Sequence, residues 1–427
     1  MARLREGQPP TVDRRRWTAI GGPQSAVRGR PSPTRIAFLC TSGIDNASPL
    51  GRWLPVAREL TRHGHELHLL LLHPTYDRLD AAERSFTRDG VQIHHVAQMH
   101  VYGQPGARRF FGGPKLAQVA LHAVIALARA ALALRPDVLH ICKPQPINGA
   151  AGWLAAHVLH IPWFVDCDDL EVEANRMSSP LLRAGVDWWE RHLPHGAHGV
   201  TVNTRFLYER FLRAGIATDR IAYIPNGADA TADATADAAI KTNPRCVAYV
   251  GTMSTVAHGV DLLLDAFAQV AARVPGSHLL MVGDGDDRPA LQARAQALGI
   301  SDRVTWCGRV PRERARTLLA GAACSVDPVR DEDAMRARSP LKIVESLAAG
   351  VPVVTGDVGD RREMLGDGQA GLLVSPSDAA ALADAIARVL ENDALRAQLA
   401  AGARERRMLY RWEVLAEKWA ALYSQTA

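Results

Sequence analysis

The sequence predicts an α/β protein made of two Rossmann-like, doubly wound domains. From residue 35 onward, short apolar runs alternate with longer helical patterns, the order expected of mostly parallel sheets covered by helices. Most strand-like runs lack polar alternation, as is typical of strands buried on both faces. A chain of 427 residues is also too long for one ordinary core.

The first series of elements covers residues 35–225. Its predicted strands are 35–40, 66–72, 91–96, 137–142, 162–166, 199–203 and 221–224, and its clearest helices are 50–63, 117–134 and 149–159. Pro225-Asn226-Gly227 is a turn signal, and the Ala-, Asp- and Thr-rich stretch after it predicts a surface linker over 226–244.

The second series covers residues 245–407 and predicts a second doubly wound domain. Its predicted strands are 246–250, 278–282, 304–307, 323–326, 351–355 and 371–374. The last stretch, 408–427, contains an amphipathic helix expected over 412–423.

Charge is concentrated at the N-terminus. Residues 1–34 hold seven arginines and two acidic residues, which accounts for the whole net charge of +5. We predict a disordered basic tail there and no general nucleic-acid surface. Peripheral contact of this tail with anionic lipid is the alternative.

Cysteine usage and the apolar segments predict a cytoplasmic protein. The six scattered cysteines form no C-x-x-C pair, which favours free thiols over disulfides or a zinc site. The N-terminal arginines are not followed by an apolar segment, so no secretory signal is expected. Residues 117–134 contain His122 and Arg129 and are interpreted as a buried helix rather than a membrane span.

The densest functional signal lies between residues 338 and 354. Ser339 is a good helix N-cap, Pro340 suits the first helical position and Gly350 ends the helix. The N-terminus of such a helix binds diphosphates through its free N–H groups and dipole. Arg338 and Lys342 are placed to neutralise phosphate charge. The alternative is an ordinary capped helix with one Lys–Glu pair.

Glycine-rich turns follow the first three strands of the second series. They are Gly251-Thr252, Gly283-Asp284-Gly285 and Gly308-Arg309-Val310. Ligands of open α/β sheets bind at these carboxyl ends. Each turn alone is weak evidence, because glycine also simply permits a tight bend.

The second half resembles the C-terminal domain of glycosyltransferase family 4 over 246–400, and the first half matches it more loosely from residue 35. The resemblance implies the GT-B fold, in which two Rossmann-like domains face each other across a cleft. It implies a bacterial-type hexosyltransferase (EC 2.4) that moves a sugar from a nucleotide-diphosphate sugar, with retention, to a sugar, lipid or small-molecule acceptor. It also implies no bound cofactor or metal and no nucleic-acid partner.

The same resemblance assigns roles to individual residues. Glu345 corresponds to the ribose-binding second acid of the family's Glu-x7-Glu motif. Trp412 lies where the family's final helix crosses back to the N-terminal, acceptor-side domain, so residues 408–427 are expected to pack on residues 35–225. The residues expected on the donor side are Gly251, Thr252, His258, Gly283, Gly285, Arg309, Val310, Ser339, Pro340, Leu341 and Glu345.

This sequence departs from the family pattern at three places. Ala337 stands where the first Glu of the motif is expected, and Thr252 and His258 replace the usual phosphate-binding Arg and Lys. We expect Arg338 and Lys342 to act as the catalytic cations instead. Cys142 replaces a His found in some relatives, and the adjacent Lys143 is expected to reach the cleft; a solvated loop charge is its alternative.

In the first half, the acceptor-side candidates are Gly43, Asp45, Gly51, His140 and Asp168. His140 lies inside a predicted strand, so a core histidine is its alternative reading. The run 166–169 contains three aspartates, but adjacent residues of an extended chain point to opposite sides, which argues against a metal site. Rival functions are a nucleotide-sugar 2-epimerase-like enzyme and a non-catalytic nucleotide-sugar-binding protein.

Overall fold

A computed structural model describes residues 34–46, 48–103, 109–174, 177, 179–229 and 243–424. Two large sheets of mostly parallel strands organise this part of the chain, and the described residues from Thr34 onward belong to one compact unit. Nearly all of the expected basic tail and most of the expected linker lie outside the described residues. The domain boundaries given above remain a prediction.

The first sheet has eight strands in the order β10-β9-β8-β7-β1-β2-β4-β3. They are β1 (Arg35–Cys40), β2 (Glu66–His73), β3 (Ser85–Arg88), β4 (Val91–Gln98), β7 (Val138–Cys142), β8 (Trp163–Cys167), β9 (Gly199–Val202) and β10 (Ile221–Tyr223). Neighbours are parallel except for β3 with β4. The sequence reading missed β3, because this edge strand is short and mostly exposed and so has no apolar run.

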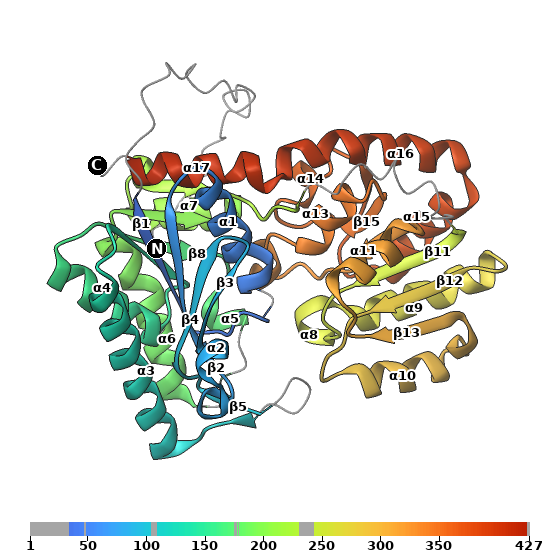
Figure 1. The fold of residues 1–427 in the computed structure, drawn as a ribbon. Coiled ribbons are helices and arrows are strands. Elements are labelled where there is room, and N and C mark those ends of the chain that lie inside the picture. The colour runs from blue at the N-terminus through green and yellow to red at the C-terminus, as the bar shows by residue number, and fades with distance from the viewer. Residues whose placement is uncertain are drawn as a thin grey trace, which may run out of the picture. The chain divides into compact units, whose positions relative to one another are not determined.

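Helices cover both faces of this sheet (Figure 1). They are α1 (Leu54–Arg62), α2 (Ala81–Arg84), α3 (Gly113–Leu134), α4 (Pro146–Leu159), α5 (Glu171–Ala174), α6 (Pro180–Gly196) and α7 (Arg205–Arg213). A π-helical turn (η2, Pro49–Trp53), two 3-10 turns (η3, Tyr76–Arg78; η4, Thr218–Arg220) and a ribbon (β5, Val101–Tyr102; β6, Arg109–Phe110) complete it.

β1 shows how one strand serves two cores. Ala37 and Leu39 pack into the cluster that contains α3 and α4, whereas Ile36 and Phe38 pack into the cluster that contains α1 and the last helix. Successive side chains of a strand point to opposite faces, so an apolar strand of this kind joins both layers.

α3 is less buried than the sequence predicts. It begins at Gly113, and only 28% of its most apolar 18-residue window is buried. Among the described residues it alone is long and apolar enough to cross a membrane, a test that core helices of soluble proteins also pass. The expectation of a buried helix is therefore wrong for its outer face.

The second sheet has six parallel strands in the order β13-β12-β11-β14-β15-β16. They are β11 (Asn243–Val250), β12 (His278–Val282), β13 (Val304–Gly308), β14 (Ala322–Asp327), β15 (Val353–Gly356) and β16 (Gly371–Val374). Its helices and 3-10 turns are α8 (Thr255–His258), α9 (Val260–Arg273), α10 (Arg288–Ala297), η5 (Ser301–Arg303), α11 (Arg312–Ala320), α12 (Asp333–Arg336), α13 (Leu341–Ala348), α14 (Arg361–Met364), α15 (Ala379–Glu391), α16 (Asp393–Arg406) and η6 (Arg407–Tyr410).

The last helix, α17 (Trp412–Ser424), packs on the first sheet rather than the second (Figure 1). Trp412 and Trp419 are fully buried there, and the Trp419 ring stacks on Phe38 with centroids 5.8 Å apart. The C-terminal segment thus contributes to the core of the first half.

Candidate functional site

The helix predicted to bind phosphate begins one residue later than expected. α13 starts at Leu341, and Pro340 is its N-cap with an extended ψ of 113° and no capping side chain. The Ser339 hydroxyl instead accepts a hydrogen bond from the backbone N–H of Asn226 at 3.1 Å. The prediction of Ser339 as N-cap and Pro340 as first helical residue is therefore wrong, because the Asn226 backbone N–H, in the turn 225–227, binds the serine hydroxyl.

Lys342 lies in the first turn of α13 and points to the end of β14. Its Nζ is 3.1 Å from Asp327 Oδ1 and lies 5.3 Å from the Tyr249 ring centroid. Burial lowers the pKa of Lys342, although Asp327 opposes this. Asp327 also binds the Arg361 Nε at 2.8 Å, so this carboxylate is shared between two cations.

Arg338 connects the two halves of the chain. Its Nε is 3.3 Å from Asp169 Oδ1, and its Nη1 donates to the carbonyl oxygen of Ala257 at 2.8 Å. His258 lies beside both candidate cations: burial, Lys342 and Arg338 together lower its pKa to about 2. The structure thus brings Arg338, Lys342 and His258 together at the start of α13.

The glycine turns at the ends of β11 and β12 pack on each other. A Cβ on Gly283, whose φ is 128°, would overlap the carbonyl oxygen of Gly251, and one on Gly285 would overlap that of Met253. The N–H of Gly251 donates to Val282 O at 2.9 Å, which fixes the two turns together. Close backbone approach therefore explains both glycines of the second turn.

The remaining donor-side candidates occupy the rim of these turns. Thr252 and Arg309 are exposed, whereas Val310 is half-buried. A Cβ on Gly251 would lie 3.3 Å from Lys342 Cε, so this turn is in contact with the α13 cation.

Glu345 is held by a cation that the sequence reading did not single out. Its Oε1 is 3.6 Å from Arg312 Nη2, and burial raises its pKa. Arg316, on the same helix α11, binds Asp229 Oδ2 at 2.8 Å. Asp229 also binds Arg58 of α1 at 2.5 Å. This carboxylate, at the start of the expected linker, therefore pairs with arginines of both halves. The sequence signal that could have identified this cation is the arginine-rich run 312–316, which follows the third glycine turn.

In the first half, Lys143 is neither a solvated loop charge nor a free cation. Its Nζ is 2.8 Å from Asp168 Oδ1, 3.3 Å from Asp169 Oδ2 and 2.8 Å from Glu171 Oε1. Burial and the neighbouring carboxylates raise the pKa of Asp168 to about 7, although Lys143 opposes this. No group of His, Cys, Asp or Glu in the described ranges is arranged to hold a metal.

The other first-half candidates occupy different environments. Gly43 is buried, Asp45 is exposed, and Gly51 lies against α13, where an added Cβ would be 2.5 Å from Leu341 Cδ1. His140 is fully buried, and its Nδ1 lies 2.8 Å from the Tyr423 hydroxyl of α17. The acceptor-side role predicted for His140 is wrong, because its strand position places the ring in the core.

A buried network that sequence reasoning missed joins the first sheet to α13. The Arg52 guanidinium binds Asp166 through Nε at 2.7 Å and Nη2 at 2.8 Å, and its Nη1 donates to Asn226 Oδ1 at 3.1 Å. Asn226 Nδ2 then donates to the carbonyl oxygen of Ser339 at 2.8 Å. These partners lie more than 100 positions apart, so no local pattern pairs them.

Comparison with known families now bears on both halves. Residues 52–227 match the family described as glycosyl transferase 4-like domain, and residues 244–392 match glycosyl transferases group 1. The chain belongs to glycosyltransferase family 4. Its family 4 relatives include phosphatidyl-myo-inositol mannosyltransferase of Mycobacterium tuberculosis, 33% identical over 52% of this chain. D-inositol 3-phosphate glycosyltransferase of Xylanimonas cellulosilytica is 28% identical over 68% of this chain and 72% of its own length. The chain spans 58% of the length of the mycobacterial relatives.

Solved structures show that this family 4 chain has the GT-B fold. Sucrose-phosphate synthase from Thermosynechococcus elongatus has a TM-score of 0.72, 22% identity and coverage of 92% of this chain and 98% of its own. Anabaena HepE in complex with UDP-glucose has a TM-score of 0.67, 20% identity and coverage of 92% and 100%. The predicted fold class is confirmed.

Proposed function

We propose that the chain is a hexosyltransferase that takes a sugar from a nucleotide-diphosphate sugar and transfers it to an acceptor bound by the first half. The supporting observation is the grouping of Arg338, Lys342 and His258 around the start of α13. This start lies beside the glycine turn that follows β11. An anion with two phosphates fits a place where helix N–H groups and two cations converge.

The reaction breaks the bond between the anomeric carbon and the diphosphate, so negative charge develops on the leaving phosphate. Arg338 and Lys342 would stabilise this charge electrostatically, which is the largest single contribution in many enzymes. To do so they must exchange their present carboxylate partners, Asp169 and Asp327, for phosphate oxygens. Transfer with retention and without a metal ion is part of the proposal and rests on the family.

Glu345 would accept hydrogen bonds from the ribose hydroxyls. It lies one turn after Lys342 on α13, and its Oε1 is 3.6 Å from Arg312 Nη2. The acceptor would meet the Lys143, Asp168 and Asp169 cluster, whose carboxylates suit sugar hydroxyls. Sugar, lipid and small-molecule acceptors are all compatible with this chemistry, in the cytoplasm or at a membrane surface.

A thermal-shift screen with UDP- and GDP-sugars tests the donor site. A ligand that binds only the folded state raises the unfolding midpoint by mass action. We expect one nucleotide sugar to stabilise the wild type, and Glu345→Ala, Lys342→Ala and Arg338→Ala to lose that shift. Lys115→Ala, an exposed lysine of α3, is the matched control. Unchanged shifts in all three site variants would refute the placement of the donor.

Product analysis tests the reaction itself. With the stabilising donor and a panel of acceptors, we expect nucleoside diphosphate release that depends on acceptor and persists in EDTA, and a product whose anomeric configuration by NMR matches the donor's. Inhibition by EDTA, or an inverted product, would contradict the corresponding part of the proposal.

One observation favours a second candidate, a non-catalytic nucleotide-sugar-binding protein. Ala337, at the position of the family's first motif acid, is fully buried and packs into the core cluster of the first half. The contact that this acid makes to the transferred sugar must therefore come from elsewhere. Donor binding with no turnover on any acceptor would favour this candidate.

A further inference from the structure

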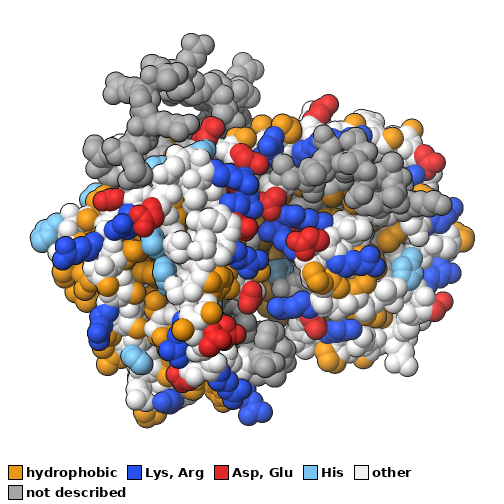
Figure 2. Space-filling view, viewed as in Figure 1, with side chains coloured by type: hydrophobic (Ala, Val, Ile, Leu, Met, Phe, Trp, Pro, Cys, Tyr) orange, Lys and Arg blue, Asp and Glu red, His pale blue; other side chains and the backbone are white. Residues whose placement is uncertain are grey.

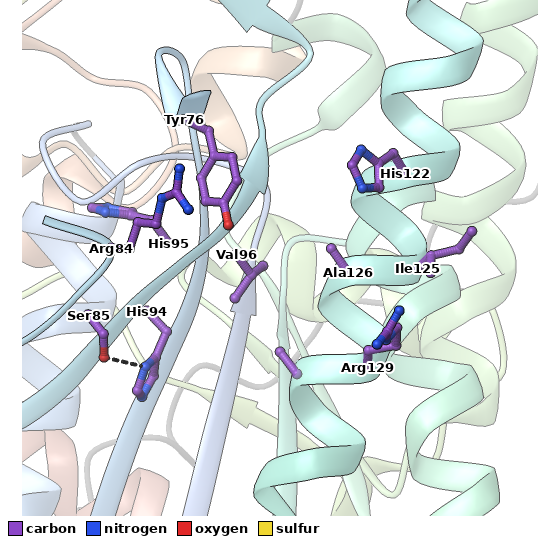
Figure 3. A pocket seen from close by; sticks show the side chains of 11 residues that line it. Tyr76, Arg84, Ser85, His94, His95, Val96, His122, Ile125, Ala126 and Arg129 are labelled. Atoms are coloured by element: carbon purple, nitrogen blue, oxygen red, sulfur yellow. Dashed lines mark hydrogen bonds between the residues drawn. The ribbon is translucent and has the colours of Figure 1, made fainter. Parts of the chain in front are cut away.

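A pocket lies on the first half, between α3 and the β3–β4 edge of the sheet. It has a volume of about 410 Å³, within the range of small-molecule sites. Figure 3 shows Tyr76, Arg84, Ser85, His94 and Val96 on one side and the side chains of α3 on the other. The α3 residues that line it are His122, Ile125, Ala126, Arg129 and Ala130.

The charge of this pocket has one sign. Arg84 and Arg129 supply two permanent positive charges, and no Asp or Glu occurs among the described residues that line it. Burial lowers the pKa of His94, which favours the neutral ring as a hydrogen-bonding group. The neighbouring Glu83 carboxylate accepts from the N–H of Asp80 at 3.0 Å as a helix cap.

One polar atom of the pocket lacks a partner. Arg84 Nε has no hydrogen-bond partner in the part of the chain that the structure describes, although the Arg84 guanidinium stacks on the Tyr76 ring at 4.7 Å. His95 does not add to this, because it pairs with Leu71 on the α1 face of the sheet and its ring therefore points away from α3. Buried polar atoms are nearly always satisfied, so Arg84 Nε indicates a missing partner.

Two further polar residues of the pocket are fixed in position. His94 Nδ1 lies 3.0 Å from the Ser85 hydroxyl (Figure 3), and His94 Nε2 lies 3.1 Å from His68 Nδ1. Ordered side chains around two arginines suit a compact, multivalent oxyanion better than a diffuse surface attraction.

We propose that this pocket binds a phosphate ester group, held by Arg84 and Arg129 from opposite walls, at a site separate from the start of α13. The guanidinium forks would take the phosphate oxygens, and the Tyr76 hydroxyl would complete the hydrogen bonds. The proposal does not depend on the transfer reaction, because none of these residues contributes to the donor site.

The surface beside the pocket decides which phosphates should be tested. Ile125 lines the pocket and is 46% exposed, and Leu121, one turn earlier, is 62% exposed. Trp153 and Val158 extend this apolar area onto α4, and Figure 2 shows hydrophobic side chains with Lys, Arg and His gathered over this part of the molecule. Neither α3 nor α4 contains an acidic residue. A phosphate on a lipid head group and a phosphate on a soluble compound are thus both to be tried.

The experiment compares two double variants that lose the same charge. Arg84→Gln/Arg129→Gln removes the pocket arginines, and Arg88→Gln/Lys115→Gln removes two exposed cations of β3 and α3 that do not line the pocket. Binding of the full chain is measured by calorimetry with glycerol 3-phosphate, and by co-sedimentation with phosphatidylcholine vesicles with and without phosphatidic acid. The thermal unfolding midpoints of both variants verify that they fold.

We expect the pocket variant to bind at least ~10-fold more weakly than the wild type in one of the two assays, because two charge-assisted bonds are lost. The control variant should stay within about 2-fold of the wild type in that assay. Loss confined to vesicles identifies a lipid head group, and loss with glycerol 3-phosphate identifies a soluble ester. Equal binding by both variants in both assays would overturn the proposal.

Discussion

His140 illustrates how a single ring in the core can set the response of this protein to acid. Burial lowers its pKa to about 3, against an ordinary value near 6.5. Between these two pKa values the unfolded chain protonates His140 and the folded chain does not. The free energy of unfolding is therefore unaffected by His140 above pH 6.5 and falls as the pH is lowered toward 3.

The test compares Tyr423→Phe with His140→Phe/Tyr423→Phe, because Tyr423 donates to or accepts from the ring at 2.8 Å and would otherwise be left unpaired. Relative to its stability at neutral pH, the double variant should lose about 2 kcal/mol less than the single variant on going to pH 5. Urea unfolding at both pH values measures this difference. Parallel pH profiles would show that His140 does not titrate in the unfolding reaction.

Individual contacts were predictable where they are local in sequence. Arg338 and Lys342 lie within four residues of each other, so one helix start suffices to group them. Their partners Asp169 and Asp327 come from strands and loops elsewhere, and the pairing depends on tertiary packing that a single sequence does not display. The cap at Ser339 was missed for the same reason, because Asn226 takes its hydroxyl.

Secondary-structure elements were predicted best where the apolar run is uninterrupted. β1, β12 and β16 have the bounds that their apolar runs indicate, although β1 is almost completely buried and β16 only partly. The exposed edge strand β3 carries no such signal. The π-helical turn Pro49–Trp53 was interpreted as part of an ordinary helix, because residue patterns do not distinguish one extra residue in a turn.

This π-helical turn packs on α13 through Gly51. A Cβ there would lie 2.5 Å from Leu341 Cδ1, the end of a flexible side chain. We therefore expect Gly51→Ala to lower the free energy of unfolding by ~1–3 kcal/mol, as overpacking does, and to weaken donor binding by moving the first residue of α13.

Leu341→Ala is the partner variant for this prediction. If the steric contact is the cause, Gly51→Ala should cost less in the Leu341→Ala background, and denaturant unfolding of the four proteins in a double-mutant cycle measures the coupling. An additive cycle would attribute the Gly51 effect to the backbone of the turn instead.

At the scale of the whole molecule, the buried Arg52 network joins the first sheet, the turn 225–227 and the start of α13. Arg52 holds the pKa of Asp166 at about 2 in spite of burial, so Asp166 is ionised in a dry environment. Arg52→Met would leave this carboxylate without its cation, and we expect a loss of ~3–5 kcal/mol in the free energy of unfolding.

Asp166→Asn provides the control for Arg52→Met. Trp53 Nε1 donates to Asp166 Oδ2 at 2.8 Å and the Thr201 hydroxyl donates to Oδ1 at 2.6 Å. Asparagine keeps an oxygen for Trp53, and its amide NH2 can donate to the Thr201 hydroxyl, which also accepts hydrogen bonds. The double variant Arg52→Met/Asp166→Asn should therefore recover part of the stability that Arg52→Met loses. A double variant no more stable than Arg52→Met would show that packing of the guanidinium, rather than charge, explains the loss.

Asp169 of the first half competes with the proposed donor for the Arg338 guanidinium. Asp169 of the first half binds Arg338 at 3.3 Å, and Lys143 and Arg338 lower the pKa of Asp169 despite its burial. Donor phosphate must displace this ionised carboxylate, so Asp169→Asn should free Arg338 and raise donor affinity by ~2- to 10-fold, most at low salt. Asp168→Asn is the matched control at pH 8, above the pKa of about 7 of Asp168, because Asp168 shares Lys143 with Asp169 but has no ion pair with Arg338 among the described residues. Titration of both variants with the stabilising nucleotide sugar measures the effect, and equal gains in both would assign it to the general loss of negative charge.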